Sequence, residues 1–214
     1  MILAIDTSIG STVAVVEPSG DVRSLAESAD ALGHAEIIGE LLERALAEAG
    51  IPSDGITHVA AGMGPGPFTG LRIGIAAARA FALGRGIPVV PVASHTAAAL
   101  RHIREHGDAR PFAIVTDARR RENAVSVYAG TDEHGLPRRV AGPELRPRAT
   151  DLAADPLLAD RAAEIVEVGA VSAADVGRVA ALALASRVEL PDTEPLYLRS
   201  PDVTLSAGPK RVSA

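Results

Sequence analysis

The sequence contains no cysteine and only one lysine, and each absence removes a class of chemistry. Without thiols the chain cannot form disulfides, zinc–thiolate sites, iron–sulfur clusters or a cysteine nucleophile. The single lysine, Lys210, lies near the end of the sequence among serine, glycine and proline residues. Walker-A phosphate binding and Schiff-base catalysis both need a lysine held in a folded core, so the sequence argues against both.

Aromatic residues and long apolar runs are also scarce. Only 2% of the residues are aromatic although 47% are hydrophobic, so the core must be built from Val, Ile, Leu and Ala, which suits an α/β protein. No apolar run approaches the ~20 residues of a membrane span. The apolar stretch Met1–Ile5 contains no basic residue of the kind that opens a signal peptide, and it is followed at once by Asp6. We therefore expect a cytoplasmic protein without a membrane segment.

The chain is acidic, with a net charge of −6 and a pI of about 5.5. It lacks the broad positive field that a protein needs to hold a nucleic-acid backbone on its own. Any contact with RNA is therefore expected to run through another chain. The arginine cluster Arg119–Arg121 fits a solvated surface best, and docking of an acidic partner or an RNA phosphate is the alternative.

A glycine-rich stretch, Gly62–Gly74, has five glycines and two prolines in thirteen residues, so it must contain a shaped loop. Glycines before a helix can cradle a phosphate, but this loop has neither the P-loop lysine nor the spacing of a dinucleotide site. The small residues Gly70, Gly74, Ala78 and Ala82 recur every four positions. One face of the helix therefore carries almost no side-chain bulk, so another backbone can approach it closely. We predict that this face is a docking surface.

Hydrophobic periodicity predicts the order βββαβαβα for the first half of the chain. The expected elements are a three-strand meander over residues 2–28, helix 34–49, strand 57–61, helix 71–83, strand 87–92, and a helix capped by Ser94 and ending near His106.

The second half begins in the same way, with a strand over 111–117 that ends in an aspartate and a second strand over 123–129. This echo suggests a duplicated architecture. A loop-rich region, a strand and a helix are expected to follow at residues 135–150, 163–168 and 173–188. The resulting boundaries are an N-terminal subdomain 1–106, a smaller C-terminal subdomain 107–190, and a segment 191–214 whose tail is expected to be disordered.

Two groups of polar residues are candidates for a site. Asp6, Thr7 and Ser8 follow the first strand, where they could contact a phosphate or metal or could simply cap the turn, and Asp117 ends the equivalent strand of the second half. His102 and His106 could share a metal on one helix face, but the helix dipole explains them more simply, so no metal site is predicted.

Four motifs together resemble the TsaB family, a subunit of the bacterial machinery that makes threonylcarbamoyladenosine on tRNA. They are Ile2–Ser8, Gly64–Gly74, Asp117–Arg119 with Glu122, and Pro195–Arg199. The resemblance implies an α/β protein with an actin-like ATPase fold of the sugar kinase/Hsp70 type, built from two βββαβα-type subdomains.

The resemblance also implies a role. A TsaB-like chain is a non-catalytic scaffold that binds and activates a TsaD-like catalytic subunit, and through it a TsaE-like ATPase. The complex transfers threonylcarbamoyl to adenosine 37 of tRNA, which this chain would meet only indirectly. The catalytic relative carries a metal-binding His-x-x-x-His pair, whereas this sequence has His95 and Ala99 at the two places, so the pair is missing here.

In the family the first two helices bind the partner and also join two copies into a homodimer. Mapped onto this sequence, the expected interface residues are Glu36, Ile37, Leu41, Leu71, Arg72, Gly74 and Ala78. No tightly bound cofactor is expected, and ATP or ADP in the complex would meet the candidate nucleotide residues Asp6, Thr7, Ser8 and Asp117. This sequence departs from the family pattern at Pro67 and Ala124.

Two other functions stay open at this point. An actin-fold phosphotransferase or ATPase could act alone through Asp6 and Asp117 around a metal-bound nucleotide. A glycoprotease-like hydrolase is the second alternative, and the missing metal pair and the absence of a nucleophile-elbow pattern disfavour it.

Overall fold

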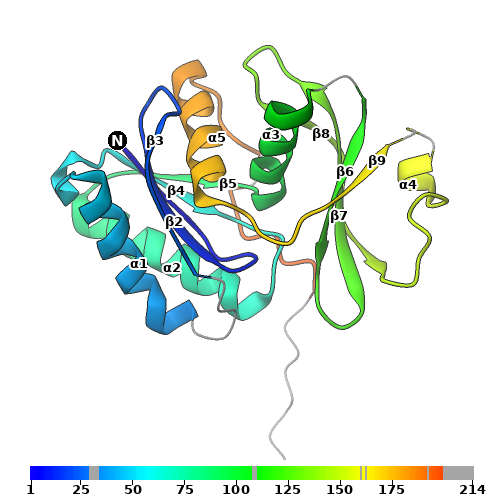
Figure 1. Ribbon diagram of the computed structural model, residues 1–214, viewed down its shortest axis with the longest axis horizontal. Coiled ribbons are helices and arrows are strands. Elements are labelled where there is room, and N and C mark those ends of the chain that lie inside the picture. Colours follow the sequence, from blue (N-terminus) through cyan, green and yellow to red (C-terminus); the bar gives the residue numbers. More distant parts are fainter. Residues whose placement is uncertain (29–33, 108–109, 160, 162, 192, 200–214) are drawn as a thin grey trace, which may run out of the picture.

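Two β-sheets stand next to one another with helices between and outside them (Figure 1). This architecture is seen in a computed structural model that describes residues 1–28, 34–107, 110–159, 161, 163–191 and 193–199. The expectation of a disordered tail, and the position of Lys210 in it, lie outside the described residues.

The first sheet has the strand order β3-β2-β1-β4-β5. Its strands are β1 (Ile2–Asp6), β2 (Ser11–Val16), β3 (Val22–Ser28), β4 (His58–Gly62) and β5 (Val89–Val92). The first three form the antiparallel meander that the sequence predicts, and β4 and β5 extend the sheet in parallel with β1. Because β1 is buried on both faces, its sequence is continuously apolar up to Asp6.

The second sheet repeats this order without a fifth strand, as β8-β7-β6-β9. Its strands are β6 (Phe112–Asp117), β7 (Glu122–Thr131), β8 (Pro137–Pro147) and β9 (Glu164–Glu167). As in the first sheet, an antiparallel meander is followed by a strand parallel to its first member. The predicted duplication of the βββαβα unit is confirmed.

The loop-rich region predicted at 135–150 is wrong, because β8 is a long strand there. Its prolines are tolerated for local reasons. Pro137 and Pro147 stand at the two ends of the strand, and Pro143 follows Gly142 where the register with β7 shifts. At these positions a proline costs the ladder little, since it has no N–H to donate.

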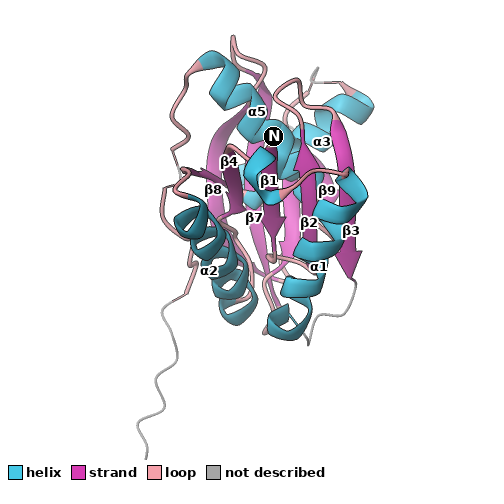
Figure 2. Ribbon diagram, turned by 90° about the vertical axis from the view of Figure 1, so that its left-hand side faces the viewer, coloured by secondary structure: helices cyan, strands magenta, loops and turns pink. Residues whose placement is uncertain are grey.

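Four helices cover the sheets. α1 (His34–Ala49) and α2 (Phe68–Arg85) lie side by side on one face of the first sheet, as Figure 2 shows. α5 (Ala173–Ser186) covers the opposite face, and α3 (Ser94–His106) packs between α5 and the second sheet. A short η1 (Ser53–Gly55) and α4 (Pro156–Ala159) complete the described elements.

The helices α3 and α5 cross between the two halves, which corrects the predicted subdomain boundary. α5 belongs to the segment 107–190 but buries Val176 and Val179 against the first sheet. α3 belongs to the segment 1–106 but packs Ala98 and Ala99 against Phe112 of the second sheet. A cut at residue 106 would therefore remove a helix from the core of each half.

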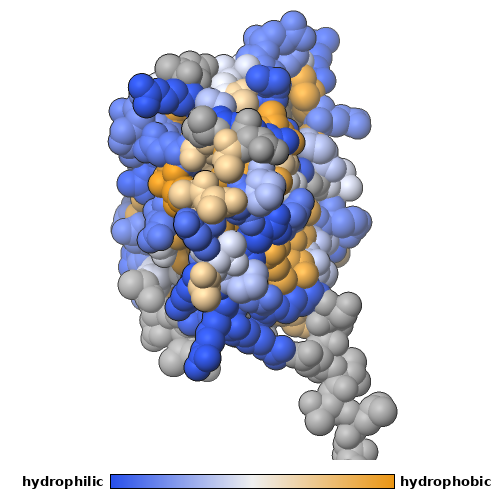
Figure 3. All heavy atoms as spheres, turned by 90° about the vertical axis from the view of Figure 1, so that its right-hand side faces the viewer, coloured by the Kyte–Doolittle hydropathy of each residue, from blue (hydrophilic) through white to orange (hydrophobic). Residues whose placement is uncertain are grey.

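The outer surface of the second half mixes hydrophilic and hydrophobic side chains, with the apolar ones in separate patches (Figure 3). Ile165 on the edge strand β9 is one exposed apolar residue. No helix in the described part of the chain is long and apolar enough to span a bilayer.

Candidate functional site

The glycine loop leaves β4 at Gly62, enters α2 at Phe68, and is fixed by Ser94 at the start of α3. The Ser94 amide donates to the carbonyl oxygen of Gly64 at 2.7 Å, and the Gly64 amide donates back to Ser94 Oγ at 3.1 Å. The predicted role of Ser94 as a helix cap is wrong. Ala93 occupies the N-cap position, and the Ser94 side chain instead joins the loop to Asp6.

Asp6 is only 1% exposed and its carboxylate is surrounded by donors. Oδ1 accepts from the Ser8 amide at 2.8 Å and from Ser8 Oγ at 2.5 Å, while Oδ2 accepts from Ser94 Oγ at 2.6 Å. Burial raises the pKa of Asp6 above its ordinary value, and the hydrogen bonds from Ser8 and Ser94 oppose that rise without cancelling it. Asp6 therefore organises the glycine loop from inside the protein.

Gly62 seals the remaining side of this carboxylate. A Cβ atom at Gly62 would lie 1.9 Å from Asp6 Oδ2, so the backbone of β4 passes directly over the carboxylate. Thr7 and Ser8 are equally buried and bonded within the chain. The residues predicted to contact a nucleotide or metal at this strand end do not fit such a group, since their polar atoms already have partners inside the fold.

The small-residue face of α2 is filled by the same chain. Thr7 Oγ1 donates to the Gly70 carbonyl at 2.7 Å and accepts from the Gly74 amide at 3.1 Å, and Ala78 and Ala82 are buried in the core below. The interpretation of this face as a docking surface is therefore wrong. The spacing did signal a close backbone approach, but the approaching element is the end of β1.

The residues predicted to form the partner interface differ in how accessible they are in the folded chain. Leu41, Leu71, Gly74 and Ala78 are buried in the core of the chain, where no other protein can reach them. Ile37 is half-buried and Arg72 is exposed. Glu36 falls in the first turn of α1, and its side chain lies outside the described residues.

The turn between β6 and β7 carries three consecutive arginines in the left-handed region, with φ of 65° at Arg119, 53° at Arg120 and 62° at Arg121. Non-glycine residues in this region each cost about 1–2 kcal/mol, so surrounding contacts must hold the turn. Asp117 Oδ1 accepts from the Arg119 amide at 2.8 Å and pairs with Arg148 at 2.7 Å. Partial burial by itself would raise the pKa of Asp117, but these hydrogen bonds and arginine charges lower it below its ordinary value.

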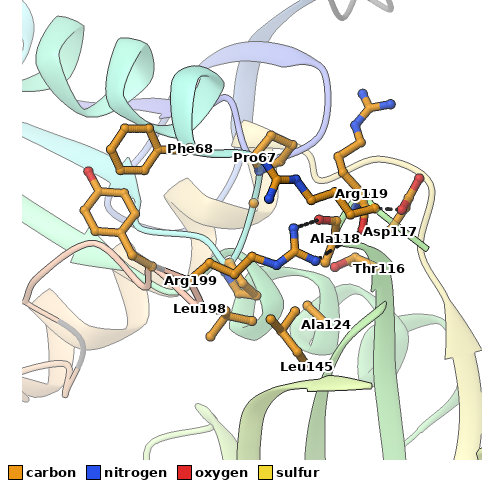
Figure 4. A pocket seen from close by; sticks show the side chains of 14 residues that line it. Pro67, Phe68, Thr116, Asp117, Ala118, Arg119, Ala124, Leu145, Leu198 and Arg199 are labelled. Carbon is orange, nitrogen blue, oxygen red and sulfur yellow. Dashed lines mark hydrogen bonds between the residues drawn. The ribbon is translucent and has the colours of Figure 1, made fainter. Parts of the chain in front are cut away.

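The glycine loop and this arginine turn face one another across a cavity of about 350 Å³ between the two halves of the chain (Figure 4). The third wall comes from the segment Pro195–Arg199, which the sequence singled out only as a family motif. The cavity combines apolar walls with guanidinium groups, and its lining includes Pro67, Phe68, Asp117, Arg119, Leu145, Leu198 and Arg199.

His95 is a buried link between the halves and contacts Thr116, which lines the cavity. Its Nδ1 and Nε2 are 2.8 Å from Ser126 Oγ and 2.9 Å from Thr116 Oγ1. Burial, and to a lesser extent the charge of Arg139, lowers the pKa of His95 to about 3. The ring is therefore neutral and serves as a joint between α3 and the second sheet.

The other histidine pair, His102 and His106, stacks ring on ring with centroids 4.7 Å apart. His102 also packs against Phe112 of the second sheet. Within the described residues, no group of three or more His, Asp or Glu side chains is placed to hold a metal ion.

The repeated βββαβα units with crossing helices define an actin-like ATPase fold, and the comparisons with known proteins agree. A family model described as TsaD, tRNA N6-adenosine threonylcarbamoyltransferase, matches residues 28–136. An uncharacterised protein of Mycobacterium tuberculosis is 36% identical over 208 residues, which cover 94% of this chain and 92% of that protein. The tRNA N6-adenosine threonylcarbamoyltransferase of Streptococcus pneumoniae is 49% identical over 59 residues, 28% of this chain and 18% of the enzyme.

Two solved structures resemble this chain over nearly its full length. YeaZ from Pseudomonas aeruginosa superposes with a TM-score of 0.72 at 26% identity, over 92% of this chain and 99% of the other. A second structure, of a protein similar to that YeaZ, matches equally well at 28% identity. The chain belongs to the TsaD family, and its full-length likeness to YeaZ makes it a member of the TsaB type.

Proposed function

We propose that this chain is a non-catalytic scaffold subunit in the modification of tRNA to threonylcarbamoyladenosine, and that it binds and activates a TsaD-like catalytic subunit. The family and the structural likeness support a role in this modification. The observation that carries the scaffold role is an apolar face on α2 that the chain itself leaves uncovered.

This face, here called the α2 stripe, consists of Ala76, Ala80 and Leu83. All three side chains are exposed, and Leu83 is 84% exposed. Their spacing of four and three residues places them on one side of the helix, opposite the buried Gly74 and Ala78. The exposed side of α2 also carries Arg72 and Arg79, and the α2 stripe is the apolar strip beside them. Helices of soluble proteins normally direct polar side chains outward, so this strip favours contact with another protein.

The shape of the surface suits helices as partners. α1 and α2 are adjacent and contain 16 and 18 residues, so they span about 24–27 Å. Exposed alanines permit close helix packing, and two further helices laid across this pair would complete a four-helix contact. The same face could serve a second copy of the chain in the free state and the catalytic subunit in the complex.

The burial of Asp6 supports the proposal that the partner, and not this chain, carries out the transfer reaction. An independent phosphotransferase would need Asp6 open to a metal-bound nucleotide, but Asp6 is enclosed by Ser8, Ser94 and Gly62. Of the four candidate nucleotide residues, Asp117 lines the cavity between the halves together with Arg119. Binding of ATP or ADP therefore stays a prediction for the assembled complex, as does the indirect contact with tRNA and a TsaE-like ATPase.

The substitution Ala80→Arg is expected to abolish co-elution with a TsaD-like subunit in gel filtration. It places a long charged side chain in the middle of the α2 stripe, at a position that is exposed in the free chain. Burying an unpaired charge at an interface costs at least several kcal/mol of binding free energy, which would weaken binding about 100-fold or more.

The matched control is Ala154→Arg, the same substitution at an exposed alanine near the second sheet. It is expected to leave co-elution intact. If Ala80→Arg binds the TsaD-like subunit as tightly as Ala154→Arg does, then the partner does not dock on the α2 stripe.

A further inference from the structure

The described end of the chain, Pro195–Arg199, crosses from the glycine loop to the arginine turn and is here called the strap. It forms one wall of the cavity between the halves. It begins on the first half of the molecule, where the Leu196 amide donates to the carbonyl oxygen of Met63 at 2.8 Å. Met63 is itself buried in the core beneath α2, so this end of the strap is firmly attached.

Tyr197 connects the strap to the start of α2. Its ring lies 5.0 Å from that of Phe68, centroid to centroid, and its hydroxyl oxygen accepts from Arg72 Nε at 3.2 Å. The Arg72 guanidinium also lies over the Phe68 ring at 3.7 Å from the centroid. Arg72 is exposed and stands one turn before Ala76 on α2, so the outer surface of this helix contacts the strap through two rings and a guanidinium.

Arg199 connects the other end of the strap to the arginine turn. It forms an ion pair with Glu122 and donates to the carbonyl oxygens of Ala118 at 3.5 Å and Arg119 at 3.4 Å. Figure 4 shows Arg199 extending across the cavity toward Ala118. Both carbonyls lie at the entry to the left-handed turn, so the guanidinium helps to offset the cost of its backbone conformation.

We propose that the strap is a conformational link between the outer surface of α2 and the arginine turn. Each contact alone is modest, since exposed ion pairs and long hydrogen bonds contribute little. The contacts matter together because they follow one another along the strap from α2 to the arginine turn. Arg72 and Phe68 hold Tyr197, the strap backbone joins Tyr197 to Arg199, and Arg199 holds the turn. A change at Arg72 therefore reaches residues 118–122 on the other half of the molecule.

The consequence for assembly rests on the proposed function. A subunit that docks on α2 would cover the surface next to Arg72, and the strap would pass that contact to the arginines that line the cavity. The link itself is a property of the free chain, so its test needs no partner and can fail separately from the docking proposal.

Hydrogen exchange followed by mass spectrometry on the full free chain tests the link. The variant Arg199→Ala is expected to raise exchange several-fold in the peptide covering residues 118–122. The informative variant is Tyr197→Ala, because the Tyr197 side chain contacts Phe68 and Arg72 on the first half. It is expected to raise exchange both at residues 62–68 and at residues 118–122. Arg101→Ala, which removes an exposed ion pair within α3, is the matched control and is expected to change neither peptide.

Faster exchange confined to residues 62–68 in Tyr197→Ala, with residues 118–122 unchanged, would overturn the proposal, because the two ends of the strap would then act independently. If Tyr197→Ala does not fold, Tyr197→Phe replaces it. That variant keeps the ring and removes only the hydroxyl that accepts from Arg72, and it is expected to give a smaller rise at both peptides. A turn that exchanges as in the wild type in Tyr197→Phe would equally contradict the link.

Discussion

Replacement of Gly74 by leucine is expected to lower the free energy of unfolding by about 3 kcal/mol or more. A Cβ atom at Gly74 would lie 2.2 Å from Thr7 Oγ1, which is closer than any real contact. The Gly74 amide also donates to that oxygen, so the substitution displaces a buried hydrogen bond together with the end of β1. Unfolding in urea, followed by circular dichroism, gives the loss directly.

Gly84→Leu is the matched control, because Gly84 lies on the same helix and no atom beyond its chain neighbours and the backbone of its own helix lies within 4 Å of the position that its Cβ would take. It is expected to unfold at a urea concentration equal to or slightly above that of the wild type, since replacing a glycine at an exposed helix position gains helix propensity. Equal stability of the two variants would show that Thr7 does not pack against α2. A substitution at Gly74 is therefore a poor test of partner binding, because it destabilises the fold of the chain itself.

Acidification from pH 7 to pH 5 is expected to lower the free energy of unfolding by about 2 kcal/mol through His95 alone. The pKa of His95 is about 3 in the folded chain, against about 6.5 in an unfolded chain. Below pH 6.5 the His95 side chain binds a proton in the unfolded state but stays neutral in the folded state, so the free energy of unfolding falls as the pH falls. The contribution is fully present above pH 6.5 and is lost progressively toward pH 3.

Urea unfolding at several pH values between 7 and 5 measures this slope, and His95→Gln provides the reference because glutamine does not titrate. The variant is expected to be less stable than the wild type at pH 7, since Ser126 or Thr116 loses a partner. Its stability should depend less steeply on pH, by about 1 kcal/mol per pH unit on average between pH 7 and pH 5. Parallel pH profiles for the two proteins would mean that His95 takes up its proton as readily in the folded chain as in the unfolded one, which would contradict a depressed pKa.

Local patterns in the sequence are sufficient to predict most of the elements, because α1, the first meander and β6 each have clear periodicity and clear ends. β8 was missed because three prolines suggested a loop, and sequence alone does not show that two of them stand at strand ends and one at a register shift. The crossing of α3 and α5 was missed for another reason. An Ala-rich helix shows which of its faces is apolar, but not which sheet will cover that face.

The candidate site shows the same limit. The glycines of the loop and the small face of α2 correctly indicated a close backbone approach, yet the sequence could not tell whether β1 or another protein makes it. The strap joins residues 80 and 125 positions apart, Arg199 to Arg119 and Tyr197 to Arg72. Contacts of that separation leave no local pattern, so the motif Pro195–Arg199 was visible while its role was not.

The formation of threonylcarbamoyladenosine on tRNA by a TsaD-like subunit, measured with and without this chain, tests the scaffold role most directly. With its ATPase partner and the activated threonylcarbamoyl donor present, the catalytic subunit is expected to modify tRNA with the wild-type chain or with Ala154→Arg. Modification should be lost with Ala80→Arg, and this chain alone should give none. Modification by the chain alone, or full activity with Ala80→Arg, would contradict the proposal that it acts as a scaffold through α2.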